Sequence, residues 1–374
     1  MKIDIWHNVL WSRYKGRVFS AVHQQAQASG DLVHFVQMAE TDGDRVGLGA
    51  VDLSYHRYPF ELLYPGPLNA VPRWRSVPYF FWRGLTDRSD FTIIAGYASA
   101  QDWAQLIALM LRGKARGVFC DSTLGESRPG RLRAALKRFF FRRCRLIFCY
   151  GERAKAMALH FGARPDALVQ RCQAAALPDG YDADAVPTLR ARSRSPHPSF
   201  LYVGRLAPEK NLSRLLRAFA GLLADQPSAR LRLVGAGPLQ GQLAQEAEML
   251  GIAETVTFVG GVNQDALADE YLRATALVLP SLREPWGLVV NEALAYGCPV
   301  LVSERCGCLP ELVKPGLSGI AFDPVDQAAL QRGMASLAGD EAPSAESCLA
   351  VIAPFTPEAA AADILGGIHR LQHR

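Results

Sequence analysis

The sequence lacks the features that mark secreted and membrane-spanning proteins. Its first residues, MKIDIW, lead directly into a strand-like run, with no cationic region, long apolar region or small-residue cleavage site, so no secretory signal is expected. No run approaches the roughly 18 uncharged apolar residues that would span a bilayer. We therefore expect a soluble or peripheral protein of the cytoplasm.

Closely spaced cysteine pairs are also scarce. The eight cysteines lie scattered in apolar segments, which favours buried thiols in a reducing compartment over a disulfide framework. The close pair Cys306-Gly-Cys308 has the wrong spacing for a zinc knuckle, and no second pair or nearby histidine completes a tetrahedral site. We expect neither a metal nor a cofactor.

No compositional bias towards disorder is present, and the length suits two domains. Hydrophobic residues make up 49% and charged residues 21% of the 374 residues, close to the averages of soluble globular proteins. Short β-branched runs alternate with longer amphipathic stretches, which predicts an α/β fold with parallel sheets and crossover helices. The predicted strands are Ile3–Trp6, Val33–Val36, Phe91–Ala95, Val118–Asp121 and Leu146–Cys149 in one sheet, and Phe200–Val203, Leu231–Val234, Val256–Val259, Ala276–Leu279, Val300–Ser303 and Gly319–Phe322 in another.

A segment rich in proline, serine and arginine separates the two sets of strands. Val186–Ser199 has no usable hydrophobic period and predicts an interdomain linker. The predicted domains are residues 1–186 and 199–356, joined by the linker 187–198. A final helix is predicted over 357–374, with Thr356 as its cap and Pro357 in its first turn.

Two cations follow the first strand of the second set. Arg205 and Lys210 lie in a turn at the carboxyl end of a parallel strand, where open α/β sheets bind ligands, and together they suit the neutralisation of a diphosphate. The alternative is a solvated surface pair. The next strand leads into Gly235-Ala236-Gly237, which permits close backbone approach but lacks the third glycine and the acidic residue of a dinucleotide site.

Two carboxylates flank a predicted helix start in Ser281–Glu292. Glu284 lies in a loop and Glu292 at least one turn into the helix, so they can reach the two ends of a ligand whose anionic centre meets the helix N-terminus. Each carboxylate can accept two hydrogen bonds from vicinal hydroxyls, as on a ribose or a hexose. The alternative is a loop charge and an exposed helix residue.

These motifs, with Gly297-Cys298-Pro299-Val300 and the glycines Gly316 and Gly319, resemble the C-terminal domain of glycosyltransferase family 4 over about residues 199 to 330. The resemblance implies a GT-B fold, in which two Rossmann-like doubly wound domains face a central cleft. It also implies a retaining, metal-independent, nucleotide-sugar-dependent enzyme whose final helix crosses back to the first domain.

The resemblance further implies roles for individual residues. Arg205 and Lys210 would hold the diphosphate, Glu284 the donor sugar and Glu292 the ribose, with Glu284, Arg205, Lys210 and Asp121 forming the catalytic set. The backbone amides of Trp286 to Val289 would meet the sugar and phosphates, and the loop from Gly260 to Val262 the base. The full predicted donor set is Gly16, Gly204, Arg205, Lys210, Gly235, Gly261, Val262, Glu284, Trp286, Gly287, Leu288, Val289 and Glu292.

The first half departs from the family pattern. Gly16 is the candidate for the glycine of the first strand-to-helix loop that lies near the donor phosphates, but the usual glycine doublet is absent. Asp121 stands where many relatives carry a histidine beside the donor sugar. His7, after the first strand, and Lys15 are candidates for the acceptor site; the alternative for His7 is a packed or surface side chain.

The segment Arg128–Arg145 is strongly basic. It carries eight arginines and lysines and no acidic residue, with Leu132, Leu136, Phe139 and Phe140 at helical spacing. Such a helix suits the anionic inner face of a membrane, or is a core-facing helix with a solvated cationic back. Nucleic-acid binding is not favoured, because the net charge is only +5.

The predicted function is transfer of a hexose or N-acetylhexosamine from a nucleoside diphosphate sugar, with uridine favoured, to a hydroxyl acceptor such as a lipid-linked or cell-surface glycan precursor. The alternatives are a non-catalytic GT-B module that binds a partner or a membrane, and a phosphorylase-like or epimerase-like relative.

Overall fold

The chain forms two compact units, each built on its own sheet. The computed structural model describes residues 1–43, 51–125, 130–339 and 342–371. The first unit contains Met1–Ala176 together with Phe355–Arg374, and the second contains Leu177–Pro354. The chain therefore leaves the first unit after residue 176, ahead of the predicted boundary at 186.

Helix α6 (Val186–Ser193) occupies most of the segment predicted as an irregular linker, so that prediction is wrong for these residues. Only Val186 and Arg190 of the helix are buried, which leaves no periodic apolar stripe for the sequence to reveal. The Arg190 guanidinium donates hydrogen bonds to the carbonyls of Tyr271 (2.8 Å) and Ala274 (2.7 Å) at the end of α9 (Gln264–Arg273). A polar anchor therefore fixes α6 to the second unit.

The first unit contains a seven-stranded parallel sheet in the order β3-β2-β1-β4-β5-β6-β7. Its strands are β1 (Lys2–Val9), β2 (Leu32–Thr41), β3 (Phe60–Pro67), β4 (Phe91–Ile94), β5 (Ala115–Cys120), β6 (Leu146–Cys149) and β7 (Leu168–Val169). Its helices are α1 (Arg13–Ser29), α2 (Arg73–Leu85), α3 (Ala100–Leu111), α4 (Arg131–Arg143), α5 (Glu152–His160) and α14 (Pro357–His369). The five predicted strands are confirmed. The strand order reverses between β1 and β4, which makes their carboxyl ends a topological switch point.

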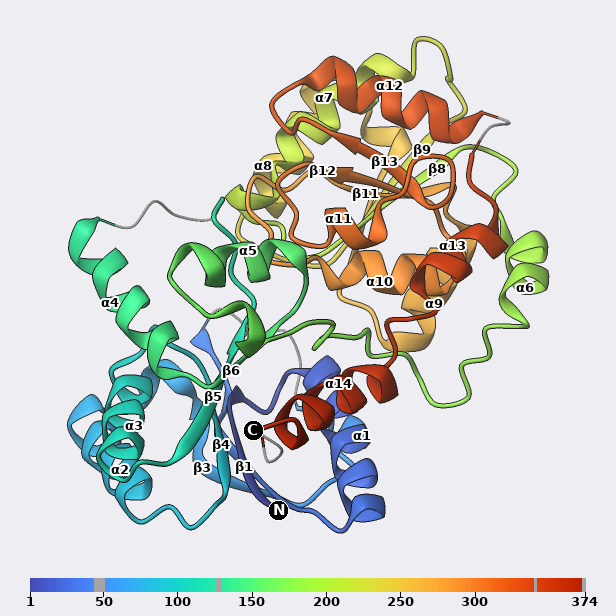
Figure 1. Ribbon diagram of the computed structural model, residues 1–374. Coiled ribbons are helices and arrows are strands. Elements are labelled where there is room, and N and C mark those ends of the chain that lie inside the picture. Colours follow the sequence, from blue (N-terminus) through green and yellow to red (C-terminus); the bar gives the residue numbers. More distant parts are fainter. Residues whose placement is uncertain (44–50, 126–129, 340–341, 372–374) are drawn as a thin grey trace. The chain divides into compact units, whose positions relative to one another are not determined.

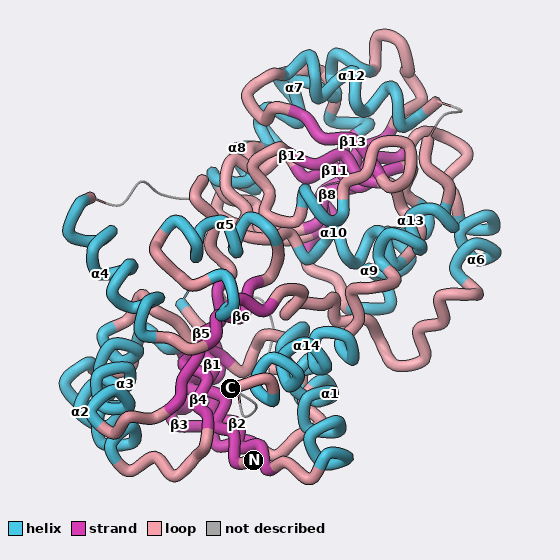
Figure 2. The backbone as a smooth tube through the Cα atoms, in the orientation of Figure 1, coloured by secondary structure: helices cyan, strands magenta, loops and turns pink. Residues whose placement is uncertain are grey.

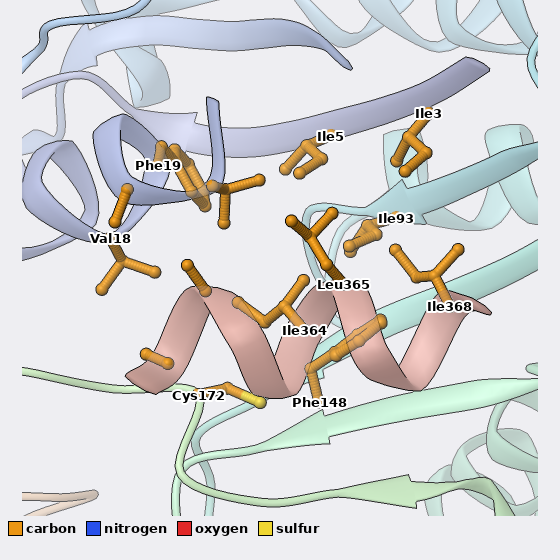
Figure 3. Close-up of a cluster of buried hydrophobic side chains, with 14 of the residues drawn as sticks. Ile3, Ile5, Val18, Phe19, Ile93, Phe148, Cys172, Ile364, Leu365 and Ile368 are labelled. Atoms are coloured by element: carbon orange, nitrogen blue, oxygen red, sulfur yellow. The ribbon is translucent and has the colours of Figure 1, made fainter. Parts of the chain in front are cut away.

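Helix α14 completes the core of the first unit. Figure 1 shows it beside α1 on one side of the sheet, with α2 and α3 on the other side. Its apolar face, including Ile364, Leu365 and Ile368, packs against Ile5 and Phe148 of the sheet (Figure 3). The Thr356 hydroxyl caps the helix by accepting from the N–H of Ala359, as predicted.

The stretch Ala345–His369 has the length and mean hydropathy of a membrane span, at 25 residues and 1.4. It contains two helices, α13 (Ala345–Ile352) and α14, which belong to different units. Since α14 buries its apolar face in a core, its apolar composition is explained by packing within the first unit.

The second unit contains a six-stranded parallel sheet in the order β10-β9-β8-β11-β12-β13, with helices around the strands (Figure 2). Its strands are β8 (Ser199–Val203), β9 (Arg230–Val234), β10 (Val256–Gly260), β11 (Ala276–Leu279), β12 (Val300–Ser303) and β13 (Gly319–Phe322). Its other helices are α7 (Leu212–Leu222), α8 (Gln240–Met249), α10 (Leu288–Ala295), α11 (Leu309–Leu312) and α12 (Gln327–Ala338). All six predicted strands are confirmed, and the strand order reverses between β8 and β11.

Candidate functional site

In the second unit, the loops that follow β8 and β9 touch backbone to backbone. Gly235 has φ 127°, and a Cβ there would lie 2.0 Å from the carbonyl oxygen of Gly204. The N–H of Gly204 donates to Val234 and that of Gly235 to Gly260, each at the carboxyl edge of the sheet. These predicted donor-site glycines therefore let the loops pack on one another, and their own amides are already bonded.

Lys210 and Glu284 form an ion pair at the switch point. The Lys210 ammonium lies 2.5 Å from Oε2 of Glu284, and the two side chains are only 15% and 14% exposed. The Ser281 hydroxyl also donates to that carboxylate, at 3.3 Å. The resemblance assigned Lys210 to the diphosphate and Glu284 to the sugar, and in the structure these two side chains are partners of one another.

The side chain of Asn211 connects its own loop by hydrogen bonds to the loops after β11 and β13, next to this ion pair. Asn211 adopts a left-handed conformation with φ 60°, and its side-chain amide donates to the carbonyls of Pro280 (3.2 Å) and Pro324 (2.9 Å). Arg205 lies earlier in the same loop, where its guanidinium pairs with Glu209 at 2.7 Å and remains partly exposed. Both predicted phosphate-binding cations thus belong to a braced loop and are each paired with a carboxylate.

The loop that carries Glu284 is supported by the Cys306-Gly-Cys308 segment. A Cβ at Gly307 would lie 1.7 Å from the carbonyl oxygen of Pro285, so only glycine fits. The N–H groups of Gly307 and Cys308 donate to the carbonyls of Glu284 (2.9 Å) and Trp286 (3.0 Å). Among the described residues, no group of three or more His, Cys, Asp or Glu side chains could hold a metal ion.

Helix α10 begins at this loop with uncapped amides. Gly287 is its N-cap, with φ 98°, and no side chain of the described residues caps the helix. The first N–H groups of a helix have no intrahelical acceptor and form an anion site, and those of Leu288 and Val289 are the groups concerned. The Trp286 indole is buried and donates to Asn291 at 2.8 Å, so this side chain anchors the helix in the core.

Glu292 lies within α10, whereas Glu284 lies in the loop before it. Five residues separate Glu292 from the N-cap, a rise of roughly 7.5 Å. Its carboxylate accepts a hydrogen bond of 2.8 Å from the hydroxyl of Tyr271, a buried residue whose ring stacks on Tyr296. Burial first, and then the charge of Glu292, raise the pKa of Tyr271 well above its ordinary value, so the hydroxyl remains a donor.

The loop after β10 completes this edge of the second unit. Gly260 ends the strand with φ 79°, and an added Cβ at Gly261 would meet nothing within 4 Å, so the surface there is open. Val262 follows in the same loop. The predicted base-binding residues thus lie in the loop that follows β10, as the sequence indicated.

The first unit has a cavity of about 320 Å³ at the carboxyl ends of its strands. His7, Lys15 and Asp121, predicted from distant parts of the sequence, all line it. Asp42 and Tyr150 line it too and were missed, although each follows a strand end and the switch-point rule would have found them.

The position of Gly16 differs from the prediction. It lies inside α1, its N–H donates to Ser12, and a Cβ would lie 2.8 Å from the carbonyl oxygen of Tyr55 and 3.0 Å from the ring of His56. Gly16 is therefore in the helix and not in the loop before it, and it permits the close packing of a neighbouring segment on α1.

His7 lies within β1 and not after it, and a buried polar chain holds its ring. Its Nδ1 is 3.3 Å from the side-chain oxygen of Gln37, whose amide nitrogen donates to the Tyr58 hydroxyl at 2.9 Å. That hydroxyl lies 2.8 Å from Nδ1 of His56. Burial lowers the pKa of His56 to about 4, so the chain ends on a neutral imidazole.

Comparison with known proteins finds sequence similarity to glycosyltransferases over the second unit. Residues 188–350 match the family described as glycosyl transferases group 1. A D-inositol 3-phosphate glycosyltransferase of Streptomyces scabiei is 37% identical over 205 residues, covering 52% of this chain and 46% of the relative. A glycogen synthase of Mycobacterium tuberculosis is 36% identical over 164 residues, covering 44% and 39%. The chain thus spans about half the length of the curated relatives it matches.

Solved structures show the fold of the whole chain. The apo lipopolysaccharide outer core galactosyltransferase WaaB has a TM-score of 0.73 at 17% identity, covering 99% of this chain and 100% of its own. Anabaena HepE in complex with UDP has a TM-score of 0.72 at 17% identity, with the same coverage. The two parallel sheets with their helices are therefore a GT-B fold. The match to the glycosyl transferases group 1 family is confined to residues 188–350, within the second unit.

Proposed function

We propose that this protein is a retaining glycosyltransferase that transfers a hexose or N-acetylhexosamine from a nucleoside diphosphate sugar, with UDP favoured, to a hydroxyl acceptor. The observation that carries the proposal is the Lys210–Glu284 pair beside the uncapped start of α10, with Glu292 farther along the helix. Relatives named glycosyltransferases and a GT-B neighbour in complex with UDP-glucose support it.

The donor would bind along the carboxyl edge of the second sheet. The diphosphate meets the N–H groups of Leu288 and Val289 and the cations Arg205 and Lys210. Glu284 accepts hydrogen bonds from the sugar hydroxyls, and Glu292 from the ribose.

Catalysis would rest on stabilising the leaving group. As the bond between the sugar and the diphosphate breaks, negative charge develops on oxygens held by the helix amides and by Arg205 and Lys210. The acceptor hydroxyl attacks from the face that the diphosphate leaves and passes its proton to the departing diphosphate oxygen, so positioning replaces a protein nucleophile. We include no resident metal or cofactor in this reaction.

The acceptor would occupy the cavity of the first unit. His7 and Asp121 line this cavity and offer hydrogen-bond partners to a hydroxyl-rich ligand. Lipid-linked and cell-surface glycan precursors are the acceptor class that we favour.

Substitution of the two cations tests the proposal. Nucleoside diphosphate release from a panel of nucleotide sugars should fall by orders of magnitude in Arg205→Ala and Lys210→Ala. Arg217→Ala removes a surface partner of Glu246 in the same unit and serves as the control. Near-normal rates in both site variants would refute the proposal, and turnover without any acceptor would indicate an epimerase-like enzyme.

Helix α4 is the proposed membrane contact. Its apolar residues Leu132, Leu136 and Phe139 are 75%, 44% and 40% exposed, whereas Phe140 and Phe141 are buried. Most of the predicted apolar stripe is thus on the surface of a helix that is otherwise rich in arginine and lysine. Residues 128 and 129 of the predicted basic segment lie outside the described residues. An exposed apolar row among cations suits an anionic bilayer surface.

Vesicle binding tests this contact. The protein should sediment with vesicles that contain phosphatidylglycerol and not with purely zwitterionic ones, and Leu132→Glu with Leu136→Glu should abolish the binding. Met249→Glu replaces an equally exposed apolar residue in the second unit and should have no effect. Unchanged sedimentation of the α4 variant would exclude this helix as the contact.

A further inference from the structure

Lys15 is a buried cation without a hydrogen-bond partner. It lies in the first turn of α1, its residue is 1% exposed, and its ammonium bonds to no group of the described residues. An ammonium has three N–H donors, and the great majority of buried polar groups in proteins are hydrogen-bonded. This ammonium can therefore donate hydrogen bonds to an acceptor from outside the protein.

Aromatic rings surround the ammonium. Its nitrogen lies 3.8 Å from the ring centre of Phe119 and 4.7 Å from that of Tyr150, with Phe19 and Tyr14 at 5.7 and 5.8 Å. Ring faces attract the charge but accept no strong hydrogen bond from the N–H groups. Burial lowers the pKa of Lys15 to about 8, so the side chain is still mostly charged at neutral pH.

The carboxylates of the same cavity do not satisfy this cation. One oxygen of Asp102 caps the start of α3, where it accepts from the N–H of Ser99 at 3.0 Å, and the other has no hydrogen-bond partner among the described residues, so neither bonds to Lys15. Burial disfavours the charge of Lys15 more strongly than Cys172 and Asp121 favour it. The side chain of Asp121 is itself exposed to solvent. His7 also lines the cavity, but its Nδ1 faces Gln37.

We propose that the cavity of the first unit binds an anionic group of the acceptor, a phosphate or a carboxylate, with Lys15 as its counter-ion. Only the attribution of the anion to the acceptor rests on the proposed function. Binding of an oxyanion in the cavity does not depend on it. The aromatic surround gives such an anion a poorly hydrated site, where a charge-assisted hydrogen bond is strong.

Sulfate is a suitable probe, because its charge does not change between pH 6 and 10. Binding is measured by calorimetry on the full chain in the presence of saturating UDP, which occupies the proposed donor site. One sulfate should bind, Lys15→Met should weaken it at least tenfold, and the affinity should fall as the pH rises past about 8. Lys155→Met, which removes a surface partner of Glu152, should leave sulfate binding unchanged.

The unfolding midpoint and the UDP affinity of Lys15→Met show whether the cation serves an acceptor anion or the diphosphate of the donor. Lys15→Met should fold with an unfolding midpoint no lower than that of the wild type, and its UDP affinity should be unchanged. Equal sulfate affinity in wild type and variant would overturn the proposal, since a water molecule would then satisfy the ammonium. A loss of UDP affinity in Lys15→Met would also overturn it, because the cation would then serve the donor diphosphate. Loss of UDP binding in Lys210→Ala bears only on the donor site.

Discussion

The Lys210–Glu284 ion pair leads us to predict that a substitution of Glu284 strengthens the binding of UDP. In the unliganded protein the ammonium is 2.5 Å from the carboxylate, so a diphosphate must share or displace a partner that is already bound. A hydrogen bond between charged groups contributes about 1.5 to 3 kcal/mol, and we expect about 2 kcal/mol for this largely buried pair. Glu284→Gln removes that competition without changing the shape of the side chain.

Free UDP should therefore bind Glu284→Gln more tightly than wild type, by roughly tenfold for about 1.4 kcal/mol recovered. Turnover of a nucleotide sugar should fall in the same variant, because Glu284 is also the proposed partner of the sugar hydroxyls. Calorimetric titration with UDP and a nucleoside diphosphate release assay give the two values. Equal or weaker UDP binding in Glu284→Gln would refute the competition.

The stability of the same variants measures the pair itself. Lys210→Met leaves a carboxylate that is 14% exposed without its cation, and the unfolding midpoint should fall by about 4 to 8 °C for about 2 kcal/mol in a domain of this size. The double variant Lys210→Met with Glu284→Gln should lose less than the sum of the single losses. A coupling energy below about 0.5 kcal/mol would mean that the two charges interact only through solvent.

Three other substitutions have distinct expected outcomes. Gly307→Ala forces a Cβ to within 1.7 Å of the Pro285 carbonyl oxygen, so UDP affinity and the unfolding midpoint should both fall; an unchanged midpoint would contradict this close packing. Tyr271→Phe removes the hydrogen bond to Glu292 and should cost about 1 kcal/mol of stability and weaken nucleoside binding, and titration with uridine tests it. Lys15→Met should be more stable than wild type below pH 8, by on the order of 3 kcal/mol, because the folded-state pKa is about 8 against an unfolded value of 10.5. Between pH 8 and 10.5 the unfolded wild type holds a proton on Lys15 that the folded form lacks, so the stability of the wild type should rise with pH. The difference in stability between wild type and Lys15→Met should therefore disappear near pH 10.5, as measured by urea unfolding at a series of pH values.

The strands were predictable because parallel strands buried on both faces appear as continuous apolar runs. Two edge strands of the first sheet, β3 and the two-residue β7, were missed. Strand β3 has the sequence FELLYPGP, and prolines are tolerated at a sheet edge but weaken the strand signal. Helix α6 was missed because the buried guanidinium of Arg190 holds it in place, and no hydrophobic periodicity indicates such an anchor.

The sequence predicted which residues lie at the candidate site, but it did not predict which of their side chains contact one another. The rule that ligands bind at the carboxyl ends of strands led to Arg205 and Lys210, and the family resemblance led to Asp121, which also follows a strand end. That Lys210 pairs with Glu284, 74 residues away, depends on loop conformations set by Asn211, which no local pattern reveals. The helical position of Gly16 was not predicted, because a glycine near a strand end suits a loop or a packed helix equally well, and here it packs against Tyr55.

The packing of α14 in the first unit has a consequence for biosynthesis. Ile364, Leu365 and Ile368 fill the core formed by strands from the first 176 residues, yet they are translated after the whole second unit. Domains generally fold as they emerge from the ribosome, so part of one apolar face of the first sheet, beside α1, stays uncovered while the second unit is made. Until α14 arrives, that face is open to chaperones and to aggregation, and a ribosome-stalled chain ending at Pro354 should be more sensitive to protease in its first unit than the finished protein.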